Sequence, residues 1–104
     1  MRLLVLEASS MNYRLWRNNC GSLATPDGRW VTYGVANPGG SDLIGIGPGG
    51  RFLAIEAKHG RNKPTREQDA FMRLVVSMGG LAAPVWSVEQ FRQYVEGAQN
   101  ETKA

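Results

Sequence analysis

The segment from Gly39 to Gly60 places charged side chains on strands that are otherwise apolar. Its sequence, GGSDLIGIGPGGRFLAIEAKHG, contains Asp42, Glu56 and Lys58. Alternate residues of a strand share a face, so Glu56 and Lys58 point one way and Ala57 points the other. Two carboxylates and an ammonium close together can hold a divalent cation and contact a phosphate group. The segment is therefore the first candidate for a site that does chemistry.

The register of the two strands decides whether the carboxylates meet. If residues 48–50 form a three-residue loop, Gly47 pairs with Arg51. Counting outward from that pair, Asp42 lies directly opposite Glu56, with Cβ atoms about 5 Å apart. The two carboxylates would repel each other there, and a Mg²⁺ ion would remove the conflict. The hypothesis is metal-assisted phosphodiester hydrolysis, with the ammonium against a phosphate or the attacking water.

A purely structural interpretation of the same residues is open. A D/E-x-K pattern appears by chance about once in a hundred-odd residues. A solvated sheet edge with an Asp–Lys or Glu–Lys surface pair would give the same sequence. The apolar run FLAIEAK and the aspartate on the paired strand favour the site.

The elements around this segment are predicted to form one domain over residues 1–104. The patterns predict helices and strands in the order α-β-β-β-β-α-β-α, over 1–10, 13–18, 29–35, 42–46, 51–58, 65–78, 81–86 and 87–98. This order indicates an α/β (α+β) fold, with a mixed β-sheet flanked by helices. Residues 20–29 are expected to form a loop, and residues 97–104 a frayed tail.

Two local signals refine the prediction. Thr65 and Gln68 have the spacing of a capping box, which explains Gln68 without any role in chemistry. Pro84 places its strand at an edge or an end of the sheet.

Composition excludes several classes of protein. The chain has 104 residues, a formal net charge of +3 and one cysteine. A single cysteine builds neither a disulfide scaffold nor a thiolate metal site. No apolar run reaches membrane-spanning length and no signal peptide is recognised, so we expect a cytoplasmic protein without membrane contact.

The motifs together resemble a known family. GGSDLIGI, GRFLAIEAK, and PTREQ followed by a helix and GG are similar to the VRR-NUC domains, a branch of the PD-(D/E)xK nuclease superfamily. RLWRNN and WVTYG resemble the small stand-alone members of phages and bacteria. The resemblance covers Tyr13 to about Phe91. It implies a restriction-endonuclease-like core and a Mg²⁺-dependent DNA endonuclease, with Mn²⁺ as a substitute, in a bacterial cell or a phage-infected host.

The resemblance also implies roles for single residues. Asp42 and Glu56 would bind the metal, with the carbonyl of Ala57 as a further ligand. Lys58 would assist the nucleophilic water, and Gln68 would complete the catalytic set.

Two departures from the family pattern matter. The family usually carries a glutamate on its first helix, and here only Glu7 is available; a surface glutamate is the alternative. From its length of 104 residues, we also expect no accessory DNA-binding domain. Stand-alone members are similar to Holliday-junction resolvases and pair as dimers, which implies a homodimer that acts on four-way junctions or other branched DNA.

Basic and aromatic residues complete the set of candidates. Arg61, Lys63 and Arg66 form the densest basic run, HGRNKPTR, which suits phosphate contacts if it is more than an exposed loop. The same DNA-contact surface could include Arg14, Arg17 and Asn18, with Asn19. His59 is either a base or a solvated loop residue. The tryptophans, expected in the core or at a dimer interface, are Trp16, Trp30 and Trp86.

Two other functions stay open at this point. One is a catalytically silent nucleic-acid-binding module of the same fold. The other is a structural dimerisation protein with a surface ion pair, for which neither metal nor DNA binding is expected.

Overall fold

A four-stranded mixed sheet forms the centre of the protein, in a computed structural model that describes residues 1–19 and 21–103. The strands lie in the order β1-β4-β5-β6, with bounds Arg14–Arg17, Leu43–Ile46, Phe52–Ala57 and Leu81–Val85. β1, β4 and β5 are antiparallel neighbours, and β6 runs parallel to β5. The predicted mixed sheet flanked by helices is confirmed. β6 is an edge strand, as its Pro84 indicated.

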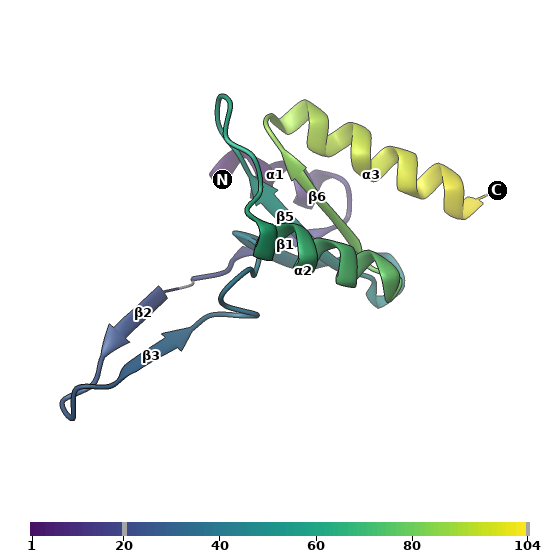
Figure 1. The fold of residues 1–104 in the computed structure, drawn as a ribbon. Coiled ribbons are helices and arrows are strands. Elements are labelled where there is room, and N and C mark those ends of the chain that lie inside the picture. Colours follow the sequence, from purple (N-terminus) through teal and green to yellow (C-terminus); the bar gives the residue numbers. More distant parts are fainter. Residues whose placement is uncertain (20, 104) are drawn as a thin grey trace.

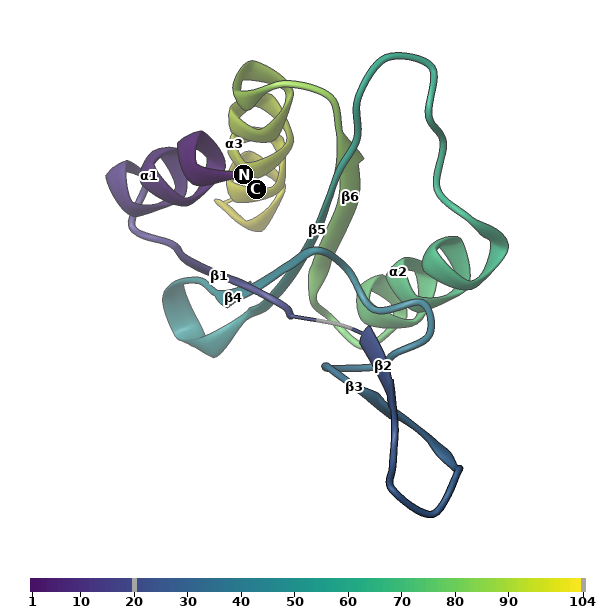
Figure 2. The same cartoon turned by 90° about the vertical axis from the view of Figure 1, so that its left-hand side faces the viewer.

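Helices cover the two faces of this sheet unequally. α1 (Arg2–Ser10) and α3 (Val88–Lys103) lie on one face, and α2 (Arg66–Ser77) lies on the other (Figure 2). The larger core lies beneath α1 and α3, where the sheet side chains are wholly buried, among them Leu43, Leu53 and Ile55. The smaller core beneath α2 consists of Ala54, Met72, Val75 and Ala82.

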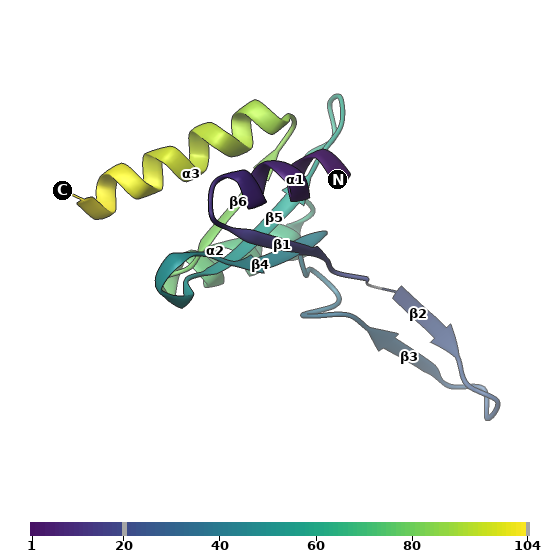
Figure 3. The same ribbon diagram turned by 180° about the vertical axis from the view of Figure 1, so that it is seen from behind.

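Residues 20–29 were expected to form a loop, and that prediction is wrong over Gly21–Ala24, whereas residues 25–29 do form the turn. β2 (Gly21–Ala24) pairs antiparallel with β3 (Trp30–Tyr33), so the order contains one strand more than predicted. Both strands belong to a separate two-stranded sheet, which we call the arm. The arm projects from the body of the protein (Figures 1 and 3), and it extends the molecule to 54 Å against 29 and 24 Å in the other directions.

The C-terminal helix is also longer than expected. α3 continues to Lys103, so the frayed tail predicted for residues 97–104 is wrong over 97–103. Ala104 lies outside the described residues, as does the one cysteine, Cys20. None of the helices in the described part of the chain has the length and apolar character needed to cross a membrane.

Candidate functional site

The turn between β4 and β5 sets the register on which the site depends. Pro48–Gly50 forms a single turn of 3₁₀ helix, with Gly49 and Gly50 at positive φ values of 76° and 80°. Glycine adopts this region at little cost, so the chain can reverse within three residues. The amide of Gly47 donates to the carbonyl of Arg51 over 2.8 Å. The predicted three-residue loop is therefore confirmed.

This register places the two acidic residues across from each other. β4 and β5 pair Leu43 with Ile55, and the next position along the ladder sets Asp42 opposite Glu56. Oδ2 of Asp42 accepts a hydrogen bond of 3.1 Å from the amide of Ala57. The aspartate is thereby fixed to the neighbouring strand at the point where β5 ends.

Glu56 is the most unusual residue of the sheet. Its side chain is 1% exposed, although it carries a carboxyl group. Oε1 accepts a hydrogen bond of 3.1 Å from Nε2 of Gln68, whereas Oε2 is buried without a donor among the described residues. Burial, followed by the hydrogen-bonding contact and the charge of Asp42, raises the pKa of Glu56 to about 8; the charge of Lys58 acts the other way. The protonated form is favoured because burial and the nearby charge of Asp42 outweigh the opposing charge of Lys58.

Gln68 joins the start of α2 to the acidic pair. A capping box holds this start of the helix, in which the backbone N–H of Gln68 donates to Oγ1 of Thr65 over 3.1 Å. In return, Oε1 of Gln68 accepts from the amide of Thr65 over 2.9 Å. The same Oε1 accepts from Nζ of Lys58 over 2.9 Å, while Nε2 donates to Glu56. The capping role and the contact with the charged residues therefore hold at the same time.

Lys58 completes a compact group with these residues. Its side chain is only 13% exposed, and its Nζ lies 3.8 Å from Oε1 of Glu56. We call Asp42, Glu56, Lys58 and Gln68 the candidate site. One strand pair and one helix cap bring together all four residues that the sequence predicted as catalytic.

The candidate site offers two neighbouring carboxylates, Asp42 and Glu56, as donors for a metal ion. The described residues contain no group of three or more histidine, cysteine or acidic side chains suited to a metal. Mg²⁺ needs only one or two carboxylates, because waters and substrate phosphates supply its other ligands. A bound cation would give the buried Oε2 of Glu56 a partner and would lower the raised pKa of this carboxyl group. Asp42 and Glu56 therefore fit the ion, and a role for the carbonyl of Ala57 stays a prediction.

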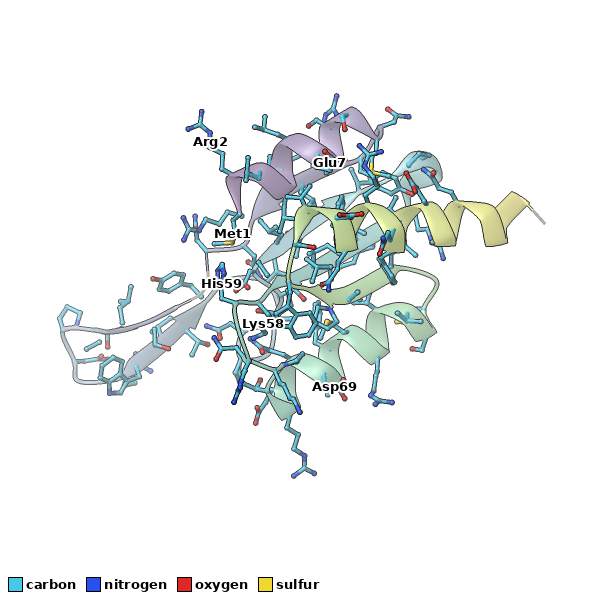
Figure 4. The ribbon with its side chains drawn as sticks, turned by 90° about the horizontal axis from the view of Figure 1, so that it is seen from above. Met1, Arg2, Glu7, Lys58, His59 and Asp69 are labelled. Carbon is cyan, nitrogen blue, oxygen red and sulfur yellow. The ribbon has the colours of Figure 1, made fainter. Side chains whose placement is uncertain are left out.

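Glu7 is not brought to this group. Its carboxylate forms an ion pair with Arg92 of α3, and the charge of Glu7 raises the pKa of that guanidinium. Figure 4 shows Glu7 on α1, well separated from Lys58 and His59. The structure thus gives Glu7 a role in joining two helices.

The predicted DNA-contact residues are separated by the structure. Arg17 pairs with Leu43, next to Asp42, whereas Arg14 pairs with Ile46 at the other end of β4. Asn18 is buried, and both the nitrogen and the oxygen of its side-chain amide form hydrogen bonds with the backbone. Its Nδ2 donates to the carbonyls of Val35 and Ser41, and its Oδ1 accepts from the amide of Val35. Asn18 therefore anchors the base of the arm and has no donor left for a phosphate.

The basic run lies in the loop that joins β5 to α2 and ends at Arg66, the first residue of that helix. Arg61, Lys63 and Arg66 are exposed, and no ion pair among the described side chains involves them. Nε1 of Trp86 donates to the carbonyl of Asn62 over 3.1 Å and so holds this loop against the end of β6. His59, at the start of the loop, is exposed.

The tryptophans do not lie in the core. Trp16, Trp30 and Trp86 are 56%, 73% and 39% exposed. The core position expected for them is wrong, and the interface position stays a prediction.

A cavity of about 510 Å³ opens beside the candidate site, where the arm leaves the body. Asp42 and Gln68 form one wall, and the residues around them include Arg17, Asn19, Tyr33 and Asn37. Sequence reasoning found neither Tyr33 nor Asn37, because both depend on how the arm folds back to β4. We call this space the arm cavity.

No known protein family, curated protein or solved structure matches this chain. The chemistry of the candidate site and of the surfaces around it must therefore indicate the function. The buried, unpaired carboxylate oxygen of Glu56 is its clearest single feature.

Proposed function

We propose that this chain is a Mg²⁺-dependent endonuclease that hydrolyses phosphodiester bonds in DNA, built on a restriction-endonuclease-like core of the VRR-NUC type. The observation that carries the proposal is the meeting of Asp42, Glu56, Lys58 and Gln68 at one end of the sheet. A surface ion pair would not need a glutamate that is 1% exposed, with one carboxylate oxygen unpartnered.

Asp42 and Glu56 would hold the metal, and each is already oriented by the protein. The backbone amide of Ala57 holds the carboxylate of Asp42, and the side-chain amide of Gln68 holds the carboxyl group of Glu56. When bound, Mg²⁺ lowers the pKa of a coordinated water and neutralises charge on the phosphoryl oxygens. The protein contributes a dry, fixed pair of ligands, which avoids reorganisation during the reaction.

Lys58 and Gln68 would position the phosphate and the water. Oε1 of Gln68 holds the ammonium of Lys58 close to the acidic pair. One N–H of that ammonium is then directed at Gln68, and the others can donate to a phosphate oxygen or to the attacking water. The exposed basic residues of the loop before α2 would bind the neighbouring phosphates of the strand.

A homodimer belongs to the proposal, since a two-fold dimer presents two sites to a branched DNA. Apolar side chains are exposed on the α2 side of the sheet at Trp16, Ile46 and Phe52, on α2 at Leu74, and at Met78, which follows the end of α2. Phe52, Leu74 and Met78 line one apolar depression, and exposed apolar surface of this kind often marks an interaction site. We expect Met78→Glu to shift the chain from dimer to monomer in analytical ultracentrifugation.

A cleavage assay tests the function. Wild type, Glu56→Gln and Lys58→Met would be incubated with a labelled four-way junction and a matched linear duplex, in Mg²⁺, Mn²⁺ or EDTA. We expect metal-dependent cleavage, reduced at least about 1,000-fold by either substitution, because the metal and the ammonium supply several kcal/mol in the transition state.

Asp69→Asn is the matched control for this assay. Asp69 follows Gln68 on α2, but it is exposed and pairs with Arg73. The Asp69→Asn variant should therefore cleave both DNAs as wild type does. Equal cleavage of the two DNAs would remove the junction preference. DNA binding without cleavage by any variant would instead support the silent nucleic-acid-binding module.

A further inference from the structure

The arm cavity is larger than the candidate site requires. Its volume is about 510 Å³, within the range of pockets that enclose small molecules. Only Asp42 and Gln68 of its lining belong to the candidate site. The part of its wall that the base of the arm contributes includes Tyr33 and Asn37, and neither residue holds the metal or positions the water in the proposed reaction.

Tyr33 supplies a fixed aromatic surface on that wall. It pairs with Gly21 across the arm, and a Cβ at Gly21 would lie 2.4 Å from the hydroxyl oxygen of Tyr33. The ring therefore lies against the backbone of Gly21, where any larger residue would displace it. Tyr33 remains 47% exposed, so the rest of the ring is accessible.

Asn37 holds the backbone around this ring in place. Its Nδ2 donates to the carbonyls of Gly21 and Tyr33, each over 2.9 Å. The two strands are thereby joined at the base of the arm. Both N–H groups are thus used, whereas Oδ1 of Asn37 has no donor among the described residues and can accept a hydrogen bond beside the cavity.

Arg17 provides a cation on the same lining. It lies on β1 opposite Leu43, the residue that follows Asp42. Its side chain is exposed and forms no ion pair among the described side chains. An accessible ring, an amide acceptor and a guanidinium are the groups that bind a base, its polar edge and a phosphate.

We propose that the arm cavity binds one unpaired nucleotide of the DNA substrate, with its base against Tyr33 and a phosphate near Arg17; this rests on the proposed nuclease function. A paired base cannot lie against the ring, because its faces are already stacked within the duplex. The cavity shares Asp42 and Gln68 with the candidate site, so the nucleotide would lie next to the scissile phosphate. The substrate class is DNA with unpaired nucleotides at the cleavage point, such as flaps, gaps and open branches.

The test measures binding without chemistry. Two oligonucleotide duplexes of one sequence would carry 2-aminopurine, either in a single-stranded gap or fully paired, and would be titrated in EDTA. We expect Tyr33→Leu to weaken binding to the gapped DNA about tenfold, since stacking on an aromatic contributes roughly 1–3 kcal/mol per base. Binding to the paired DNA should not change, and Tyr33→Phe should bind like wild type.

Trp30→Leu is the matched control. Trp30 is an exposed aromatic of the same arm, 73% accessible, but it does not line the cavity. Its substitution should leave gapped-DNA binding unchanged. An equal loss for Trp30→Leu and Tyr33→Leu, or an equal loss on gapped and paired DNA, would overturn the proposal.

Cleavage of the same oligonucleotides in Mg²⁺ separates this proposal from the nuclease function. If wild type cleaves both DNAs and Tyr33→Leu keeps the wild-type preference, the cavity proposal is overturned and the nuclease function stands. If Tyr33-dependent binding occurs but no variant cleaves, the cavity proposal stands as a property of a binding module. If wild type binds neither DNA, the cavity proposal is overturned together with the function on which it rests.

Discussion

The two faces of the central sheet are built from the same strands, yet they differ in chemistry. Leu43 and Ile55 point toward α1 and α3 and have no exposed surface. Their neighbours Asp42 and Glu56 point to the other face, where α2 packs on β5 and β6. The alternation of a β-strand thus lets adjacent residues serve different ends. The face beneath α1 and α3, which we call the closed face, carries the larger core. The face beneath α2, which we call the open face, holds the charged groups in fixed positions beside the smaller core.

The largest effect on stability is expected on the closed face. Ile55→Ala removes a fully buried side chain from the core beneath α1 and α3. We expect the free energy of unfolding to fall by about 2–5 kcal/mol, through lost burial and a residual cavity. Urea denaturation of wild type and Ile55→Ala measures this change in the free energy of unfolding. A loss below about 1 kcal/mol would mean that this face does not dominate the stability.

A smaller, pH-dependent effect is expected on the open face. The pKa of Glu56 is raised from about 4.5 to about 8, so the folded state binds this proton more tightly than the unfolded state does. The contribution of this bound proton to the free energy of unfolding is therefore complete below about pH 4.5, and it is lost as the pH rises through 8. In EDTA, the free energy of unfolding should fall over this window by an amount on the order of a few kcal/mol.

Glu56→Gln is the control for this pH dependence. Glutamine resembles the protonated glutamic acid and cannot titrate, so urea denaturation at several pH values should give a flatter profile. The same slope in both proteins would assign the pH dependence to other groups. It would also remove the contrast between a titrating face and an apolar one.

A third comparison separates the two roles of Gln68. Gln68→Ala removes the reciprocal bond of the capping box and the contacts with Lys58 and Glu56, whereas Thr65→Ala removes only the cap. Each should cost about 1 kcal/mol of stability, the usual contribution of a helix cap. Cleavage should fall about 10–100-fold for Gln68→Ala, as for other groups that orient metal ligands, and should barely change for Thr65→Ala. Equal cleavage by the two variants would leave Gln68 with a capping role alone.

The candidate site was more predictable from the sequence than the surroundings that give it shape. Its register follows from a local turn, since PGG permits a three-residue loop, and Gln68 is placed by a capping box only four residues long. Both signals depend on neighbours in the chain. Counting residues outward from the turn was therefore enough to place Asp42 opposite Glu56.

The arm could not be predicted in the same way. Residues 21–24, GSLA, lack the β-branched and aromatic residues typical of strands, and they become a strand only by pairing with Trp30–Tyr33. Asn18 has an anchoring role because Val35 and Ser41 come back to it from distant positions. The partner of Glu7 is likewise on the last helix. These roles depend on contacts between distant segments, which spacing along the chain does not show.

A calorimetric titration with Mn²⁺ tests most directly whether the open face is a metal site. Wild type and Glu56→Gln would be compared at pH 8.5, above the raised pKa of Glu56, where the carboxylate is available to the ion. Asp69→Asn and Glu7→Gln are the controls, because these acids pair with arginines elsewhere. We predict saturable binding to wild type and to both controls, and its loss in Glu56→Gln. Absence of binding to wild type, or equal binding to Glu56→Gln, would contradict the account.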